Sequence, residues 1–195
     1  EIWMKNIPDI SFNYYYAHKF SPGYIGCGMS YYNIIYNAKL LNLEHVTIFE
    51  DDCKFPQQFS YCFNIVTEFL SIYNDWDIFN GFVCQFDEKK FKIYDIFQYK
   101  NIQFIVINNM MGMVFNIYKR NCFDKILTWD NKYVFNKYLQ KGKISKNQAN
   151  YTIDRYINKY INKVVITYPY IVDILNVSSS VNIHNSKYNN DFDYN

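Results

Sequence analysis

The chain has 195 residues and half of them are apolar, so it is long enough to form one domain with a buried core. Its 20 Lys and Arg residues nearly balance its 18 Asp and Glu residues, and a formal net charge of +2 argues against a strongly basic surface for nucleic acid or an anionic membrane. We therefore predict a single domain over residues 1–186, followed by a disordered polar tail over residues 187–195.

The cysteines indicate the compartment. The five cysteines are scattered and include no Cys-x-x-Cys pair, so reduced thiols in a cytoplasmic protein fit better than a disulfide framework or a zinc site. Nothing resembles a signal peptide or an apolar run that could span a membrane, and a soluble protein is predicted. The 21 Tyr and 17 Phe, with abundant Asn, indicate a compositional bias, so a single Tyr or Asn says little about function.

The first clear periodicity begins at Gly26, where apolar residues recur at intervals of three and four and predict a helix that ends near Asn42. Gly26 and Gly28 lack the spacing of a phosphate-binding loop and predict only a tight turn. Residues 46–49 predict a short strand buried on both faces. Residues 57–73 return to helical spacing, and the run DWDIFNGF at 75–82 predicts a second strand that ends at a glycine.

The second half of the chain continues the alternation. Residues 92–107 predict one or two strands, and MGMVFNIYKRNCFDKILTW predicts a strand followed by a helix from about Lys119. A polar loop at 141–150 precedes a short amphipathic helix in TIDRYINKYI, and VVITYPYIVDI predicts a strand broken by Pro169. Such alternation favours an open α/β sheet, in which ligands bind beyond the carboxyl ends of parallel strands.

Three consecutive acids, Glu50, Asp51 and Asp52, follow the strand predicted at 46–49. Charges at such a place cost free energy unless a cation or hydrogen-bond donors compensate them. On an extended backbone Glu50 and Asp52 point the same way and Asp51 points opposite, which predicts a pair of ligands for Mg²⁺ or Mn²⁺ and one structural or ribose-facing acid. The alternative is that the acids only cap the turn that follows.

A second functional interpretation rests on Asp52-Cys53-Lys54, which has the Asp-x-Lys pattern of restriction-type nucleases. That chemistry needs another acid on a neighbouring upstream strand. Between Ile10 and Leu43 there is no Asp or Glu, so the nuclease interpretation is the weaker one.

The order of several motifs carries a resemblance to a known family. The stretch SPGYIGCGMSYYNIIYNAKLLNLEHVTIFEDDCKF resembles glycosyltransferase family 25, the lipooligosaccharide and collagen galactosyltransferase-like group. The similarity continues in order through DWDIFNGF, MGMVFNIYKRNCFDKIL, TIDRYINKYI and YPYIV, and it covers about residues 21–180.

This resemblance implies an α/β domain of GT-A type, with a Rossmann-like mixed sheet flanked by helices. It implies inverting, metal-dependent transfer of a hexose, galactose or glucose, from a UDP-sugar to a glycan or hydroxylated acceptor, with Mn²⁺ or Mg²⁺ on the donor diphosphate. The implied roles are a catalytic base at Asp154, metal ligands at Glu50, Asp52 and His184, and nucleotide-sugar contacts at Asp51 and Ser30. Asp154 could instead be a solvated helix acid beside Arg155, and His184 a solvated residue of a polar tail.

The chain departs from the family pattern at its start. The family opens with a strand of the type Ile-Asn-Leu-Asp-Arg and tens of residues before the Gly-Cys helix, whereas about twenty residues precede that helix here and contain no such strand. Either upstream sequence is missing or the domain is degenerate. A non-catalytic, glycosyltransferase-like binding module is therefore the alternative to an enzyme.

Overall fold

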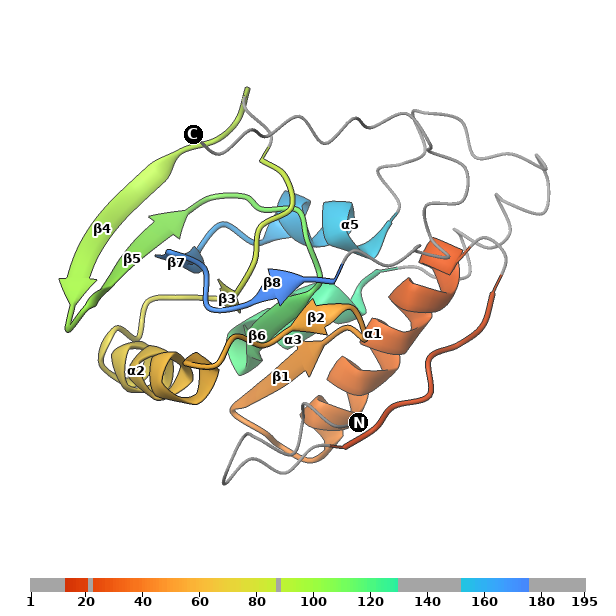
Figure 1. The fold of residues 1–195 in the computed structure, drawn as a ribbon. Helices are drawn as coiled ribbons and strands as arrows, with labels where there is room; N and C mark the ends of the chain where they lie inside the picture. Colours follow the sequence, from red (N-terminus) through yellow and green to blue (C-terminus); the bar gives the residue numbers. More distant parts are fainter. Residues whose placement is uncertain (1–12, 21–22, 87–88, 130–151, 176–195) are drawn as a thin grey trace.

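A computed structural model describes residues 13–20, 23–86, 89–129 and 152–175 of the chain. These residues form a mixed α/β domain in which helices flank one six-stranded sheet (Figure 1). The α/β fold class expected from the sequence is confirmed. The predicted loop at 141–150, the predicted tail at 187–195 and His184 lie outside the described residues.

The described helices are α1 (Gly23–Leu40), α2 (Phe59–Ile72), α3 (Arg120–Leu127) and α5 (Ile153–Tyr160). The strands are β1 (His45–Phe49), β2 (Cys53–Lys54), β3 (Ile78–Asn80), β4 (Ile93–Tyr99), β5 (Ile102–Ile107), β6 (Phe115–Lys119), β7 (Val164–Tyr168) and β8 (Asp173–Ile174). The large sheet has the strand order β1-β6-β3-β7-β5-β4, and β2 pairs with β8 in a separate two-stranded sheet. Each helix and strand predicted in the described residues is present.

The strand directions create one edge of the sheet at which several chain segments meet. β3 and β7 are parallel, and every other neighbouring pair in the large sheet is antiparallel. As a result β1, β3 and β7 run in the same direction, and their carboxyl ends lie at the same edge as the start of β6. Glu50 follows β1 directly, so the acidic triplet lies at this edge.

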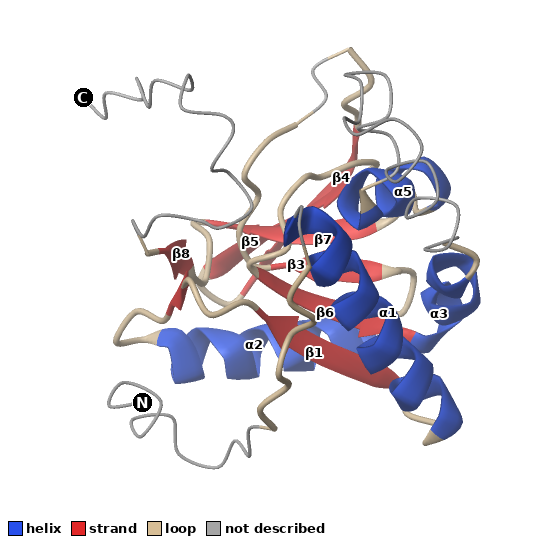
Figure 2. Cartoon of the chain, turned by 90° about the vertical axis from the view of Figure 1, so that its right-hand side faces the viewer, coloured by secondary structure: helices blue, strands red, loops and turns tan. Residues whose placement is uncertain are grey.

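Two apolar cores cover the two faces of the sheet. On one face α1, α3 and α5 pack together, and Figure 2 shows these three helices on the same side of the sheet. On the other face α2 packs with residues next to β2 and β8, including Cys53, Ile171 and Val172. The sheet is therefore held from both sides, as burial of two strand faces requires.

Helix α1 ends at Leu40 because the backbone reverses at Asn42, whose φ is +57°. The amides of Asn42 and Leu43 donate to the carbonyls of Lys39 and Ala38, and these bonds satisfy carbonyl groups of the last turn. The helix predicted from Gly26 to Asn42 is thus confirmed, with a start three residues earlier and an end two residues earlier.

Strand β1 corrects one expectation from the sequence. The pattern at 46–49 predicts burial on both faces, but His45 and Thr47 are exposed and only Ile48 is fully buried. The reason is topological: in the described sheet β1 is an edge strand whose one partner is β6. Its apolar residues fit either position, so composition alone could not distinguish them.

Gly26 and Gly28 correct a second expectation, since they lie inside α1 and not in a tight turn. A Cβ on Gly26 would stand 2.0 Å from the His18 carbonyl oxygen, and one on Gly28 would stand 2.4 Å from the Trp129 ring. Both glycines therefore allow a close approach, of the segment 13–20 on one side and of Trp129 on the other.

This packing predicts the sign of a stability change. Gly28→Ala would gain about 1 kcal/mol of helix propensity, but overpacking against the buried Trp129 ring costs about 1–3 kcal/mol. We expect a net decrease in the free energy of unfolding, measured by urea titration. Asn37→Ala on the exposed side of α1 is the control and is expected to preserve or raise the free energy of unfolding. An increase in Gly28→Ala as well would contradict the prediction, because it would show that the Trp129 ring moves aside at little cost.

Candidate functional site

The acidic triplet forms a turn anchored by three backbone hydrogen bonds. The Glu50 amide donates to the Val114 carbonyl at 2.9 Å, the Cys53 amide to the Glu50 carbonyl at 3.1 Å, and the Leu175 amide to the Asp52 carbonyl at 2.7 Å. The extended backbone assumed from the sequence is therefore wrong, because the chain turns at Asp51 and Asp52. The turn still exposes Asp51 and leaves Glu50 and Asp52 half-buried.

The loop before β6 accepts the hydrogen bond of the Glu50 backbone amide, and two buried asparagine side chains fix this loop. Asn80 and Asn116 lie opposite each other on β3 and β6 and have no exposed surface. The Asn80 Nδ2 donates to Asn116 Oδ1 at 2.7 Å and to the Gly112 carbonyl at 3.1 Å, and the Tyr31 hydroxyl donates to the Met113 carbonyl at 2.6 Å. These bonds hold the entry to β6, and sequence reasoning missed them because a single Asn in an Asn-rich chain attracts no attention.

Burial and like charges act together on Glu50. Burial and the neighbouring carboxylate of Asp52 raise the pKa of Glu50 from 4.5 to about 7, with smaller contributions from Asp51 and Asp154. Burial and Asp51 also raise the pKa of Asp52. Among the described residues no Lys or Arg forms an ion pair with any of these acids.

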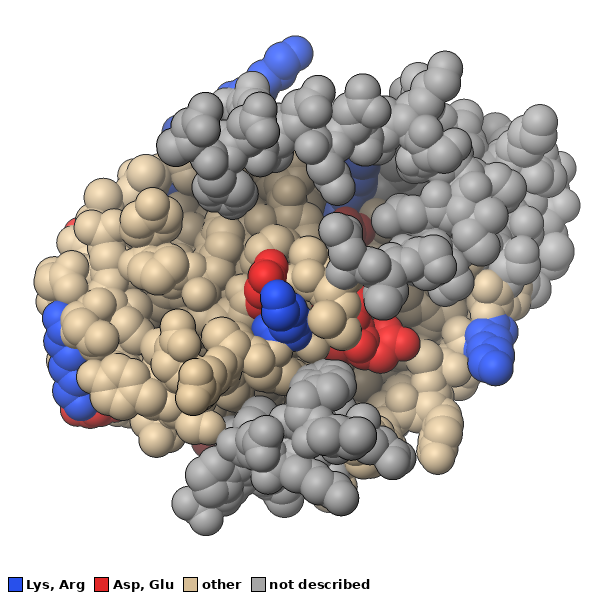
Figure 3. Space-filling view, viewed as in Figure 1, with Lys and Arg blue, Asp and Glu red and all other residues tan. Residues whose placement is uncertain are grey.

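One atom of the turn shows the lack of compensation directly. Asp52 Oδ1 is shielded from solvent and accepts no hydrogen bond from the described part of the chain. A buried carboxylate oxygen without a donor is costly. The space-filling view shows acidic side chains reaching the surface of the face that carries β2 and β8 (Figure 3).

Asp154 belongs to the same electrostatic cluster although it lies about a hundred residues further along the chain. It occupies the first turn of α5, where it is half-buried, and its charge acts on Glu50 and on the Cys27 thiol. Ile153 and Ile157 fix the helix in the core, and the Met110 amide donates to Asn158 Oδ1 at 2.8 Å. The fold thus brings a predicted base near the predicted metal ligands.

Cys27 is a residue of this site that sequence reasoning missed. Cys27 lies on α1, and its Sγ donates a hydrogen bond to Glu50 Oε1 at a distance of 3.5 Å. Burial, followed by the Glu50 charge, raises the pKa of the Cys27 thiol well above its usual range, so the group is a neutral donor. A search for cysteine pairs could not find it, because its partner is a carboxylate on another element.

The remaining predicted residues are less directly placed. Ser30 is 5% exposed, and its hydroxyl donates to the Gly26 carbonyl at 2.8 Å and accepts from the His18 amide at 2.9 Å. Both contacts lie within α1 and its neighbouring segment, so a substrate contact by Ser30 stays a prediction. Asp51 is exposed beside the cluster and is free to meet a ligand hydroxyl. His184 lies outside the described residues, so its role as a metal ligand stays a prediction.

The described residues offer an incomplete shell for a metal ion. They contain no group of three His, Cys, Asp or Glu side chains arranged to hold one. The half-buried carboxylates of Glu50 and Asp52 are nevertheless hard oxygen donors, and Asp52 Oδ1 lacks a partner within the described chain. This donor set fits a divalent cation whose other positions are filled by water and by phosphate oxygens of a ligand.

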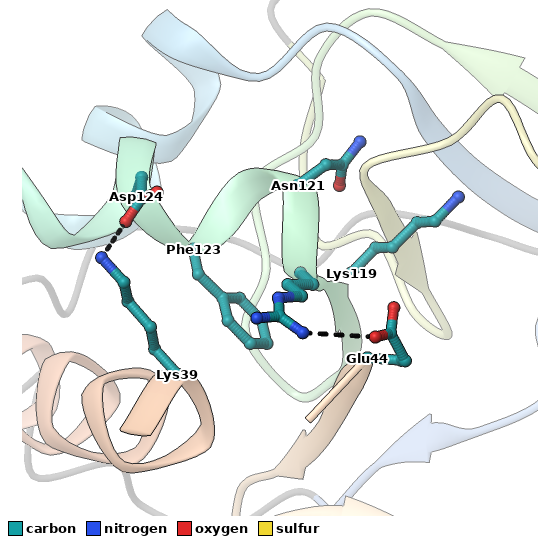
Figure 4. Close-up of a pocket in the computed structure, with 7 residues that line it drawn as sticks. Lys39, Glu44, Lys119, Asn121, Phe123 and Asp124 are labelled. Atoms are coloured by element: carbon teal, nitrogen blue, oxygen red, sulfur yellow. Dashed lines mark hydrogen bonds and ion pairs between the residues drawn. The ribbon is translucent and has the colours of Figure 1, made fainter. Parts of the chain in front are cut away.

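A separate pocket lies away from the acids, at the opposite end of β1 and β6 (Figure 4). It has a volume of about 460 Å³ and is lined by Lys39, Glu44, Lys119, Arg120, Asn121, Phe123 and Asp124. Its cations already have partners, since Lys39 pairs with Asp124, Arg120 pairs with Glu44, and Lys119 bonds to Asn74. Lys54, the lysine of the nuclease-like pattern, likewise pairs with Asp173 at 3.4 Å.

In open α/β sheets ligands bind beyond the carboxyl ends of the strands, and comparison with known families specifies the class. The model of glycosyltransferase family 25, described as an LPS biosynthesis protein, matches residues 2–175, and the chain belongs to this family. No match was found among curated proteins. Family membership makes the chain a glycosyltransferase acting on a sugar donor and an acceptor.

Membership confirms the resemblance drawn from the motifs. In addition, none of the helices in the described ranges is both long and apolar enough to cross a membrane.

The raised Glu50 pKa predicts a pH dependence of stability in metal-free protein. The folded state holds this proton more tightly than the unfolded state, so the stabilisation is present below pH 4.5 and is lost as the pH rises through about 7. The shift corresponds to a loss on the order of 3 kcal/mol. Urea unfolding with a chelator at pH 5 and pH 8 measures it. In Glu50→Gln the free energy of unfolding should change less between the two pH values. An equal change in the parent and in Glu50→Gln would contradict the prediction.

Proposed function

We propose that this glycosyltransferase transfers a hexose, galactose or glucose, from a UDP-sugar to a glycan or hydroxylated acceptor, with Mn²⁺ or Mg²⁺ bound at the acidic turn. One observation supports it above the others: half-buried carboxylates converge at a strand end, and no described cation compensates them. A donor screen with Mn²⁺, measuring UDP release and thermal shift together, tests the proposal.

The proposed metal ligands are Glu50 and Asp52, whose oxygens leave most of the coordination shell to water and the donor diphosphate. When bound, the cation stabilises the negative charge that builds on the leaving phosphate. The anchored backbone of the turn fixes the positions from which both side chains extend, without help from the ligand. Exposed Asp51 is the proposed contact to the ribose.

Asp154 is the proposed general base. Its carboxylate takes the proton of the acceptor hydroxyl while the acceptor oxygen bonds to the anomeric carbon and the bond from that carbon to UDP breaks. Attack from the face opposite to UDP inverts the anomeric configuration. The position of Asp154 in the first turn of a core-packed helix supports this role, because the base has to be held in place near the donor.

Asp52→Asn tests the proposed metal site. Removing one charge-assisted interaction of about 1.5–3 kcal/mol is expected to weaken binding by about 10–100-fold. The affinities for UDP and Mn²⁺ should fall together, because the diphosphate of UDP fills part of the coordination shell of the cation. Calorimetric titration of each ligand in the presence of the other measures this. Asp124→Asn on α3 is the control for loss of an acid, and unchanged affinities in Asp52→Asn would remove the acidic turn from the site.

Asp154→Asn separates catalysis from donor binding. The substitution preserves the size of the side chain while removing its basicity, so sugar transfer is expected to fall by about 10²–10⁴-fold. UDP and Mn²⁺ affinities and the melting temperature should change little. Transfer within a few-fold of the parent would return Asp154 to the role of a surface acid. Donor binding without any transfer in the parent would favour a non-catalytic binding module.

A further inference from the structure

We infer that Cys27 is a positioning residue of this glycosyltransferase, which orients the Glu50 carboxylate toward the cation proposed at the acidic turn. The inference rests on the proposed function, since it assigns Cys27 a task at the proposed metal site. It also gives a physical reason for the run Gly26-Cys27-Gly28 at this point of the helix.

The contact itself determines which oxygen of Glu50 is available. Cys27 Sγ donates to Oε1 and takes up one lone pair of that oxygen, so Oε2 is the oxygen of Glu50 that keeps both lone pairs for a ligand. A neutral thiol can donate to a carboxylate without adding charge. Partners of this kind commonly fix the orientation of metal-binding side chains, and their loss typically costs about 10–100-fold in metal affinity or activity.

Because Gly26 and Gly28 have no side chains, neighbouring groups pack closely against the helix on both sides of Cys27. At Gly26 the His18 carbonyl approaches so closely that a Cβ would clash, and at Gly28 the Trp129 ring does the same. The Ser30 hydroxyl, which bonds to Gly26 and His18, fixes the segment on the first side. These close approaches restrict movement of the helix at this turn, and they keep the backbone of Cys27 within reach of Glu50.

A charged side chain could orient Glu50 in place of the Cys27 thiol. The site contains no described lysine or arginine that could orient Glu50, and a cation there would also weaken the attraction for a divalent ion. A thiol avoids this conflict. It donates a hydrogen bond and leaves the negative charge of the cluster intact.

Binding measurements test the role. In Cys27→Ala the affinity for Mn²⁺ in the presence of UDP should fall by about tenfold or more, while Cys27→Ser, which retains a donor, should recover most of it. Cys122→Ala is the matched control, because Cys122 is also a hydrogen-bonded thiol, on α3, and donates to the Lys119 carbonyl instead. An equal loss in Cys27→Ala and Cys122→Ala would overturn the inference.

A spectroscopic measurement tests the contact without metal or nucleotide. The infrared S–H stretching band of Cys27, isolated as the difference between parent and Cys27→Ala, should move when Glu50→Ala removes the acceptor, whereas the corresponding Cys122 band should not. An unmoved Cys27 band would overturn the inference. If the parent binds neither Mn²⁺ nor UDP, the proposed function fails and the role of Cys27 fails with it, and the thiol band distinguishes that case from a missing contact.

Discussion

Repulsion among carboxylates at one edge of the sheet is the constraint on which the rest of the site depends. Glu50 and Asp52 are half-buried, Asp51 and Asp154 add to the same negative field, and no described lysine or arginine neutralises them. Such an arrangement persists only because other interactions hold the backbone in place. Two of the three backbone hydrogen bonds of the acidic turn join it to distant parts of the chain, at Val114 and Leu175, so the turn cannot relax without disturbing the entry to β6 or the segment after β8.

The two cores explain how this edge is held. One core fixes α1 and α5, which carry Cys27 and Asp154, against one face of the sheet. The other anchors the start of β2 through Cys53, which is fully buried. The buried amides Asn80 and Asn116 lie between these groups and tie β3 to the entry of β6.

Much of the fold could be predicted from local signals, and the site only in part. Periodicity located the helices, and the position of three acids after residues 46–49 was enough to mark the candidate site. Three things were beyond local reasoning. The edge position of β1 depends on strand order, the acidic turn is anchored at Val114 and Leu175 far along the chain, and the Cys27 contact joins residues 23 positions apart. Strand order and contacts between separate elements are pairings that composition and spacing do not encode.

The balance of costs explains why a thiol, and no described lysine or arginine, lies beside Glu50. A lysine near Glu50 would lower the repulsion and stabilise the empty protein, but the same charge would oppose a divalent ion. Neutral donors fix geometry while leaving the field of the carboxylates available to a ligand. If the proposed cation binds at this turn, it relieves the same repulsion, and the free energy that the cluster costs in the empty protein is recovered. The cost of the cluster and the proposed affinity for a cation are then two consequences of one arrangement of charges.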